Sequence, residues 1–134
     1  MNRTREAVET ITETQVTVEV AVDPEEEKQT ILHCRLPSVF FSMIRIHPTT
    51  FLIEQDGSRR QLLSALDISV APEWGPGNFR GGYMYFTLVF EGLGKACDCF
   101  HMEEFAAPTE NLLFKTDIVK RNQTDVYHVN IISE

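Results

Sequence analysis

Two alternating stretches decide the fold of this chain: residues 14–22, Thr-Gln-Val-Thr-Val-Glu-Val-Ala-Val, and residues 83–90, Tyr-Met-Tyr-Phe-Thr-Leu-Val-Phe. In the first stretch valine recurs at every second position. In the second, Phe86, Leu88 and Phe90 fall on one side. Successive side chains of a β-strand point to opposite faces, so a period of two indicates a strand with one buried face. Both stretches therefore predict half-buried strands.

Further strands are predicted at shorter runs separated by turn residues. These runs are residues 29–36, 40–46, 51–54, 59–63, 97–103, 112–120 and 125–132. Asp56-Gly57 predicts a hairpin between two of them, because glycine adopts the backbone conformations that tight turns need. The longest expected loop is 71–82, which is rich in glycine and proline. The spacing predicts an all-β fold, an antiparallel β-sandwich of about 7–9 strands.

The composition fits one folded domain. The chain has 134 residues, of which 43% are hydrophobic and 24% charged, and this balance is typical of globular proteins. We expect residues 1–13 to form a flexible N-terminal segment and residues 14–134 to form a single β-sandwich domain. No apolar run approaches the roughly 20 residues needed to cross a bilayer, so no membrane-spanning segment is expected.

The charge balance argues against several functions. Twelve Lys and Arg residues stand against 20 Asp and Glu residues, which gives a formal net charge of −8. Nucleic acid is not expected as a partner, because phosphate binding needs a basic surface. The sequence has neither a nucleophile elbow nor a phosphate-binding glycine loop. We therefore expect a non-enzymatic module without a cofactor.

Several segments in the middle of the chain resemble a known module. They are Ile44–Leu52, Asp56-Gly57, the loop from Pro72 to Gly82, Phe86–Lys95 and Phe100–Glu104. Together they resemble the small Ig-like β-sandwich accessory module of Bacteroides-type exported proteins, which often stands next to a thioredoxin-like domain. The resemblance implies an accessory, interaction or spacer unit in the periplasm or at the cell surface.

The sequence departs from that module at four positions. Gly94 stands where proline is usual, His101 stands where aspartate is usual, and Cys97 and Cys99 replace polar residues. The Cys-x-x-Cys of the usual thioredoxin-like neighbour is absent. Taken as complete, the chain has no signal peptide and would be expected in the cytoplasm, so its compartment stays open.

Cys97-x-Cys99-x-His101-x-Glu103 is the most distinctive chemical pattern. On a strand these side chains would share one face, and thiolate and imidazole are ligands that zinc prefers. A metal site or a redox-active thiol site at Cys97, Cys99 and His101 is therefore one alternative function. Against it, structural zinc sites usually take their ligands from turns, and we expect these residues simply to occupy a polar face.

Trp74, Phe79 and Arg80 are the predicted partner-binding residues. Trp74 is the only tryptophan and lies in the longest expected loop, and loops carry many binding residues. The partner would be a protein or a glycan, with Arg59 and Arg60 adding to a small basic surface. The competing interpretation is that Trp74 anchors the loop on the sandwich edge. A further alternative is a subunit that assembles through exposed strand edges.

Overall fold

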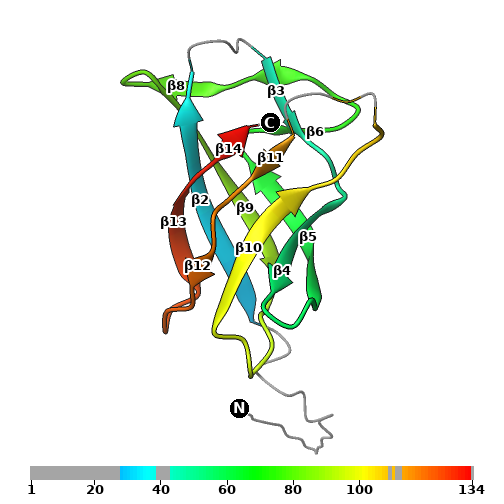
Figure 1. Cartoon of the computed structure of the whole chain (residues 1–134). Helices are drawn as coiled ribbons and strands as arrows, with labels where there is room; N and C mark the ends of the chain where they lie inside the picture. The colour runs from blue at the N-terminus through cyan, green and yellow to red at the C-terminus, as the bar shows by residue number, and fades with distance from the viewer. Residues whose placement is uncertain (1–27, 39–42, 109, 111–112, 134) are drawn as a thin grey trace, which may run out of the picture.

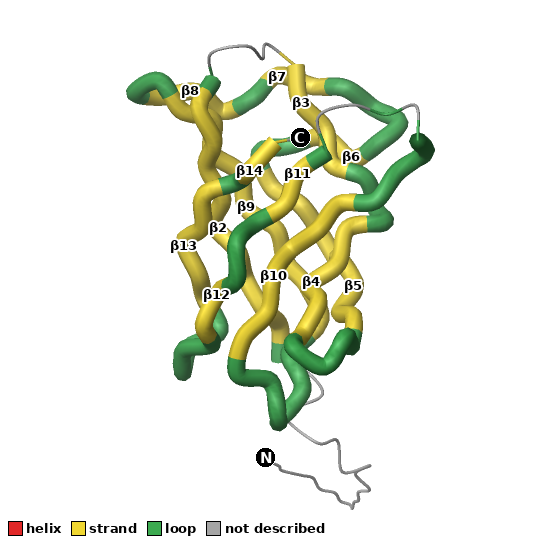
Figure 2. Tube along the Cα trace, viewed as in Figure 1, coloured by secondary structure: helices red, strands yellow, loops and turns green. Residues whose placement is uncertain are grey.

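The computed structural model describes residues 28–38, 43–108, 110 and 113–133, and every regular element in these ranges is a β-strand (Figure 1, Figure 2). The strands are β2 (Gln29–Pro37), β3 (Met43–Ile46), β4 (Thr50–Glu54), β5 (Arg59–Leu66), β6 (Ser69–Val70), β7 (Gly75–Pro76), β8 (Asn78–Arg80), β9 (Tyr83–Glu91), β10 (Cys99–Glu104), β11 (Phe114–Lys115), β12 (Val119–Lys120), β13 (Val126–Asn130) and β14 (Ile132–Ser133). The all-β prediction is confirmed. The strand predicted at 14–22 and the segment 1–13 lie outside the described residues.

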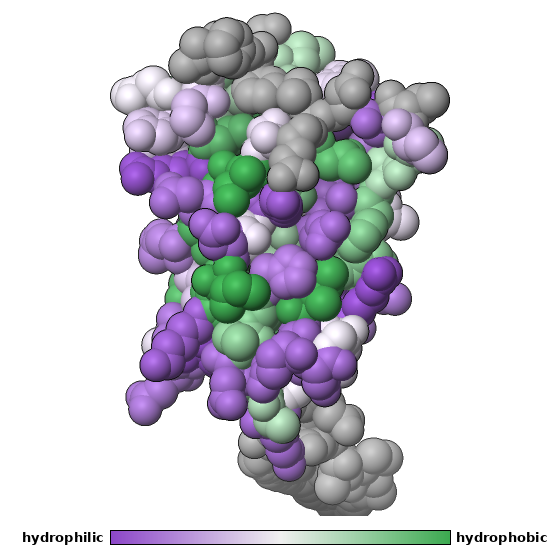
Figure 3. Space-filling model, in the orientation of Figure 1, coloured by the Kyte–Doolittle hydropathy of each residue, from purple (hydrophilic) through white to green (hydrophobic). Residues whose placement is uncertain are grey.

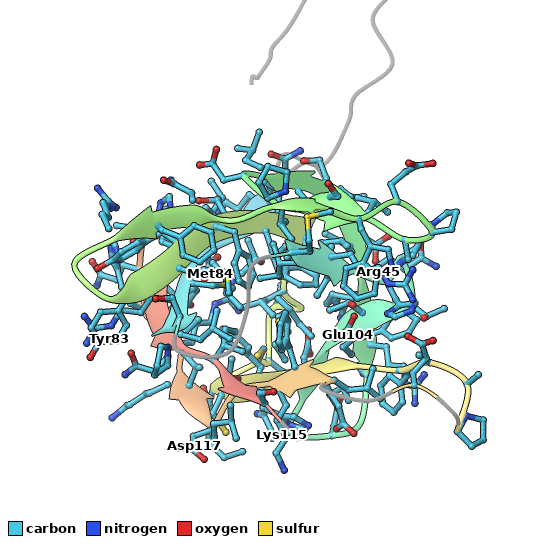
Figure 4. The ribbon with its side chains drawn as sticks, turned by 90° about the horizontal axis from the view of Figure 1, so that it is seen from above. Arg45, Tyr83, Met84, Glu104, Lys115 and Asp117 are labelled. Atoms are coloured by element: carbon cyan, nitrogen blue, oxygen red, sulfur yellow. The ribbon has the colours of Figure 1, made fainter. Side chains whose placement is uncertain are left out.

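The strands form a nearly closed, barrel-like sheet. Ten strands belong to one sheet, whose main path runs β13-β2-β9-β5-β4-β10-β11-β14, and three form a smaller sheet, β6-β3-β7. Seen from above, the ribbons lie in two layers with side chains packed between them (Figure 4). The described strands are more numerous than the sandwich prediction allowed.

The C-terminal segment connects the two ends of the main path. Its first part, β13, pairs with β2, and after Ile131 its second part, β14, pairs with β11. The pairing of β13 with β2 is parallel, as is that of β3 with β6. The expectation of a wholly antiparallel arrangement is therefore wrong. Hairpins produce antiparallel neighbours, whereas β13 reaches β2 after the chain has passed through the opposite layer.

The core consists of the inward-facing residues of both layers. Phe86, Leu88 and Phe90 are buried on the inner face of β9, as the alternation predicts. On β2 the alternate residues from Leu32 to Leu36 are likewise buried. Phe100, on the facing layer, packs edge-on against Tyr127 with ring centroids 5.0 Å apart.

Two predicted segments differ from the structure. The expected loop 71–82 contains β7 and β8, and β8 forms a tight hairpin with β9 across Gly81 and Gly82. Both glycines have positive φ, +60° and +85°, which such a two-residue turn requires. The single strand expected at 112–120 is divided into β11 and β12. At the interruption, Thr116 accepts a hydrogen bond from the Met102 amide through its side chain, at 2.9 Å.

Candidate functional site

An open groove of about 480 Å³ lies on the outer face of β13, β2 and β9, with β8 at its rim. The strand register places one row of outward side chains across it. Asn130 pairs with Arg35, Arg35 with Tyr85, and Tyr85 with Asn78. These four residues follow one another across β13, β2, β9 and β8, because paired residues on neighbouring strands point to the same face.

A second row of outward side chains crosses β13, β2 and β9 at positions two residues away from the first row along each strand. His128 pairs with His33, and His33 pairs with Thr87. The two imidazole rings stack with centroids 5.0 Å apart, and His33 Nδ1 lies 2.9 Å from Thr87 Oγ1. Both histidines are exposed. The two rows lie roughly 7 Å apart, the repeat of a strand over two residues, and together form the groove floor.

Two arginines are held in this groove by aromatic rings. The Arg35 guanidinium lies 4.6 Å from the ring centroid of Tyr83, and its Nε donates a hydrogen bond of 2.8 Å to Asn130 Oδ1. The Arg80 guanidinium lies 4.1 Å from the centroid of Tyr85. Within the described residues, neither arginine forms an ion pair. The groove therefore presents positive charge.

The predicted partner-binding residues are not brought together. Arg80 lines the groove, whereas Phe79 precedes it on β8 and is 44% exposed. Trp74 is 55% exposed and does not line the groove; Arg45 stacks on its ring at 4.2 Å. In the view from above, Figure 4 shows Arg45 and Tyr83 on opposite sides of the molecule. Their roles in partner binding stay predictions.

Arg59 and Arg60, expected to add to a small basic surface with Trp74, contact other side chains. Arg59 stacks on the rings of Phe51 and Phe105, at 5.0 and 4.8 Å. Arg60 forms an ion pair of 2.6 Å with the buried Glu54. Both arginines belong to β5, where these neighbouring side chains engage them, and their place in a small basic surface with Trp74 stays a prediction.

Arg45 belongs to a polar network at the end of the barrel. Its guanidinium forms an ion pair of 3.0 Å with Glu110, which also lies 3.4 Å from His47 Nε2. The other ring nitrogen of His47 lies 2.7 Å from the carboxylate of Glu104, which is 4% exposed. Glu104 also accepts hydrogen bonds from the amides of His47 and Phe114, both at 2.9 Å. This network joins three chain segments.

The cysteine and histidine pattern does not form one cluster. Cys97 is buried and lies in the turn before β10, with its amide bonded to Gly94, whereas Cys99 and His101 face outward on the strand. The expectation of a shared face is wrong because the strand begins at Cys99, so alternation does not extend back to Cys97. Among the described side chains, no group of three or more metal-ligating residues is found.

The two buried thiols are poorly suited to redox chemistry. Burial raises the pKa of Cys97 to about 11, and the negative charge of Glu54 contributes to the shift. Burial also raises the pKa of Cys34 far above that of a free thiol. Since the thiolate is the reactive form, both groups are unreactive near neutral pH.

Sequence reasoning missed most of the groove. His33, Arg35 and Tyr85 point outward on two strands that the sequence predicts. Their polar side chains at alternate positions could have indicated an exposed binding face. His128 and Asn130 complete the rows only because β13 pairs in parallel with β2. Alternation identifies the face of a residue but not its neighbour on the next strand.

A second, smaller pocket of about 260 Å³ is lined by Lys28, Leu93, Lys95 and Arg121. On the face turned to the viewer in Figure 3, hydrophobic residues form separate patches between hydrophilic ones. No helix that could cross a membrane occurs in the described part of the chain. Comparisons with protein-family models, with curated proteins and with solved structures found no match.

Proposed function

We propose that this protein is a non-enzymatic binding module that binds its ligand in the groove across β13, β2, β9 and β8. The observation that carries the proposal is the pair of outward rows, in which exposed polar and aromatic side chains gather in one concavity. Concave sites with a few convergent polar groups are the usual form of ligand sites. We further propose that the barrel is a variant of the Ig-like accessory module that the sequence resembles.

The groove is preorganised for binding. Its floor strands are held by the core beneath them, and Thr87 and Asn130 each hold a side chain of the floor through a hydrogen bond. Side chains that are already ordered lose less conformational entropy when a ligand arrives. This supports binding rather than a spacer role, which would not require such ordering on an exposed face.

The alternative functions have less support. A metal or redox site would need Cys97 beside Cys99 and His101, but Cys97 belongs to the core. Assembly through strand edges would need a long unpaired edge. Within the described residues, the two ends of the main sheet path are β13 and β14, which are five and two residues long, so both edges there are short.

The proposal is tested by filling the groove. Thr87→Trp places a large side chain in the second row, while Ile118→Trp places the same side chain at a site 68% exposed on the opposite layer. Amide spectra of the isotope-labelled full chain are recorded with neutral and acidic di- and trisaccharides and with short peptides. We expect a binder to shift signals of β2, β9 and β13, and only Thr87→Trp to abolish those shifts. Binders that act elsewhere, or no binder among the probes, would contradict the proposal.

A further inference from the structure

The groove is lined by two arginines, Arg35 and Arg80, although the chain as a whole is acidic. Resting on the proposed function, we propose that its ligand is an acidic saccharide whose carboxylate or sulfate groups are bound by Arg35 and Arg80. The chain has a formal net charge of −8, yet these two cations share one concavity. One acidic side chain, Asp67, also lines the groove, and its carboxylate accepts a long hydrogen bond of 3.5 Å from the side-chain amide of Asn78.

Three of the other described arginines are engaged with carboxylates, and a fourth, Arg59, lies over the rings of Phe51 and Phe105. Arg45 pairs with Glu110, Arg60 with Glu54, and Arg121 with Asp125. These pairs lie in partly buried networks, where an unpaired charge would be costly. Arg35 and Arg80 are exposed and, within the ranges that the structure describes, form no such pair. They are available to an anionic ligand.

The geometry of the two guanidinium groups suits an oxyanion. Asn130 occupies Nε of Arg35, so the two terminal nitrogens of that side chain stay available as donors. Contact with the rings of Tyr83 and Tyr85 restricts the position of each guanidinium group. A planar guanidinium forms paired hydrogen bonds with carboxylate and sulfate oxygens, which a lysine cannot reproduce.

The remaining residues favour a saccharide over a peptide. Along the floor, β2 lies between β13 and β9, and β9 pairs with β8 or β5 on its other side. Both β2 and β9 are therefore paired on both edges, so a peptide cannot add to either of them as a further strand. Among the described strands of the floor, only the outer edge of β13 is left for such an addition. Thr87 and Asn78 offer hydroxyl and amide groups to sugar hydroxyls. Four strands span roughly 14 Å, the length of a short oligosaccharide.

The experiment measures binding to the full chain by titration calorimetry. The probes are trigalacturonate, a sulfated chondroitin disaccharide, the neutral galactotriose and the peptide tetraglutamate. We expect one site that binds an acidic saccharide, and the first two probes distinguish carboxylate from sulfate. Arg35→Gln and Arg80→Gln should each raise Kd about tenfold or more, the factor expected when a hydrogen bond to a charged group is lost.

Arg59→Gln is the matched control, since Arg59 is likewise stacked on aromatic rings but lies outside the groove. Its Kd should stay within about twofold of the original, as expected for an exposed site far from the ligand. Melting temperatures establish that the variants fold, and Arg35→Lys, which keeps the charge, should bind with intermediate affinity. Equal binding of the neutral probe, or binding of tetraglutamate alone, would overturn the inference and leave a binding function standing. If no probe binds in the groove, both proposals fail.

Discussion

Replacing Glu104 by alanine should destabilise the protein by about 3 kcal/mol, the sum of two orphaned donors at roughly 1.5 kcal/mol each. The carboxylate is buried and accepts hydrogen bonds from two backbone amides, those of His47 and Phe114. Without it, both amides are left in the interior without an acceptor. The third donor, the His47 ring, has a side chain that is 18% exposed, so water can replace its partner at little cost.

Glu104→Gln gives an intermediate case. The amide keeps one oxygen acceptor, but its NH₂ group must then face a donor on the other side. This variant should cost about 2 kcal/mol, since one donor is left unsatisfied and two donors are brought together. Glu103→Ala is the control, because Glu103 is the neighbour on the same strand but faces outward, with its carboxylate 3.2 Å from His101 Nε2. Its removal should cost less than about 0.5 kcal/mol.

The assay is urea unfolding followed by intrinsic fluorescence and by circular dichroism. Coincident transitions would establish two-state behaviour, and the midpoint at constant slope gives the free-energy change. The order expected for destabilisation is Glu104→Ala, then Glu104→Gln, then Glu103→Ala. A cost below about 1 kcal/mol for Glu104→Ala, close to that of the control, would refute the claim that this carboxylate joins the three segments.

The thiols and one aromatic residue give three further tests. In native protein at pH 8, a thiol reagent should modify Cys99 first, with Cys34 and Cys97 reacting only on unfolding; rapid reaction of all three would contradict their burial. Because burial raises the pKa of Cys97 from 9.0 to about 11, the unfolded state loses its proton first, and the free energy of unfolding should fall as pH rises through that interval. Urea titrations at several pH values should show a smaller decline for Cys97→Ser. Trp74→Ala should cost about 0.5–1 kcal/mol, the contribution of its exposed stacking with arginine; thermal unfolding measures it, and a loss above about 3 kcal/mol would make Trp74 a core residue.

The sequence predicts which face of a strand is buried better than it predicts which strands pair with each other. Alternation correctly placed Phe86, Leu88 and Phe90 on one buried face, because burial on one side of a strand leaves a local pattern. The hairpin of β8 and β9 was missed although Gly81 and Gly82 carry its signal, since proline and glycine around them indicated a loop. The position of His128 beside His33 had no local signal at all, because it depends on a pairing between distant strands.

The prediction that Cys97 shares a face with Cys99 and His101 failed for a related reason. The alternation from Cys97 to Glu103 is present in the sequence, but where a strand begins depends on the path of the preceding turn. The turn holds the Cys97 amide on the carbonyl of Gly94, at 3.1 Å, and the thiol enters the core. The conformation of this turn separates Cys97 from the other candidate ligands, Cys99 and His101, and alternation in the sequence does not predict that conformation.

The closing segment of the barrel also has a consequence during synthesis. Arg35 and Asn130, which hydrogen-bond across β2 and β13, are 95 positions apart in the chain. A nascent chain that has not yet released residues 126–133 leaves β2 without its parallel neighbour and β11 without β14. Neither layer can complete its pairing until this last part of the barrel emerges from the ribosome. Folding should therefore be concerted and late, and the ligand groove should form in the same step as the barrel.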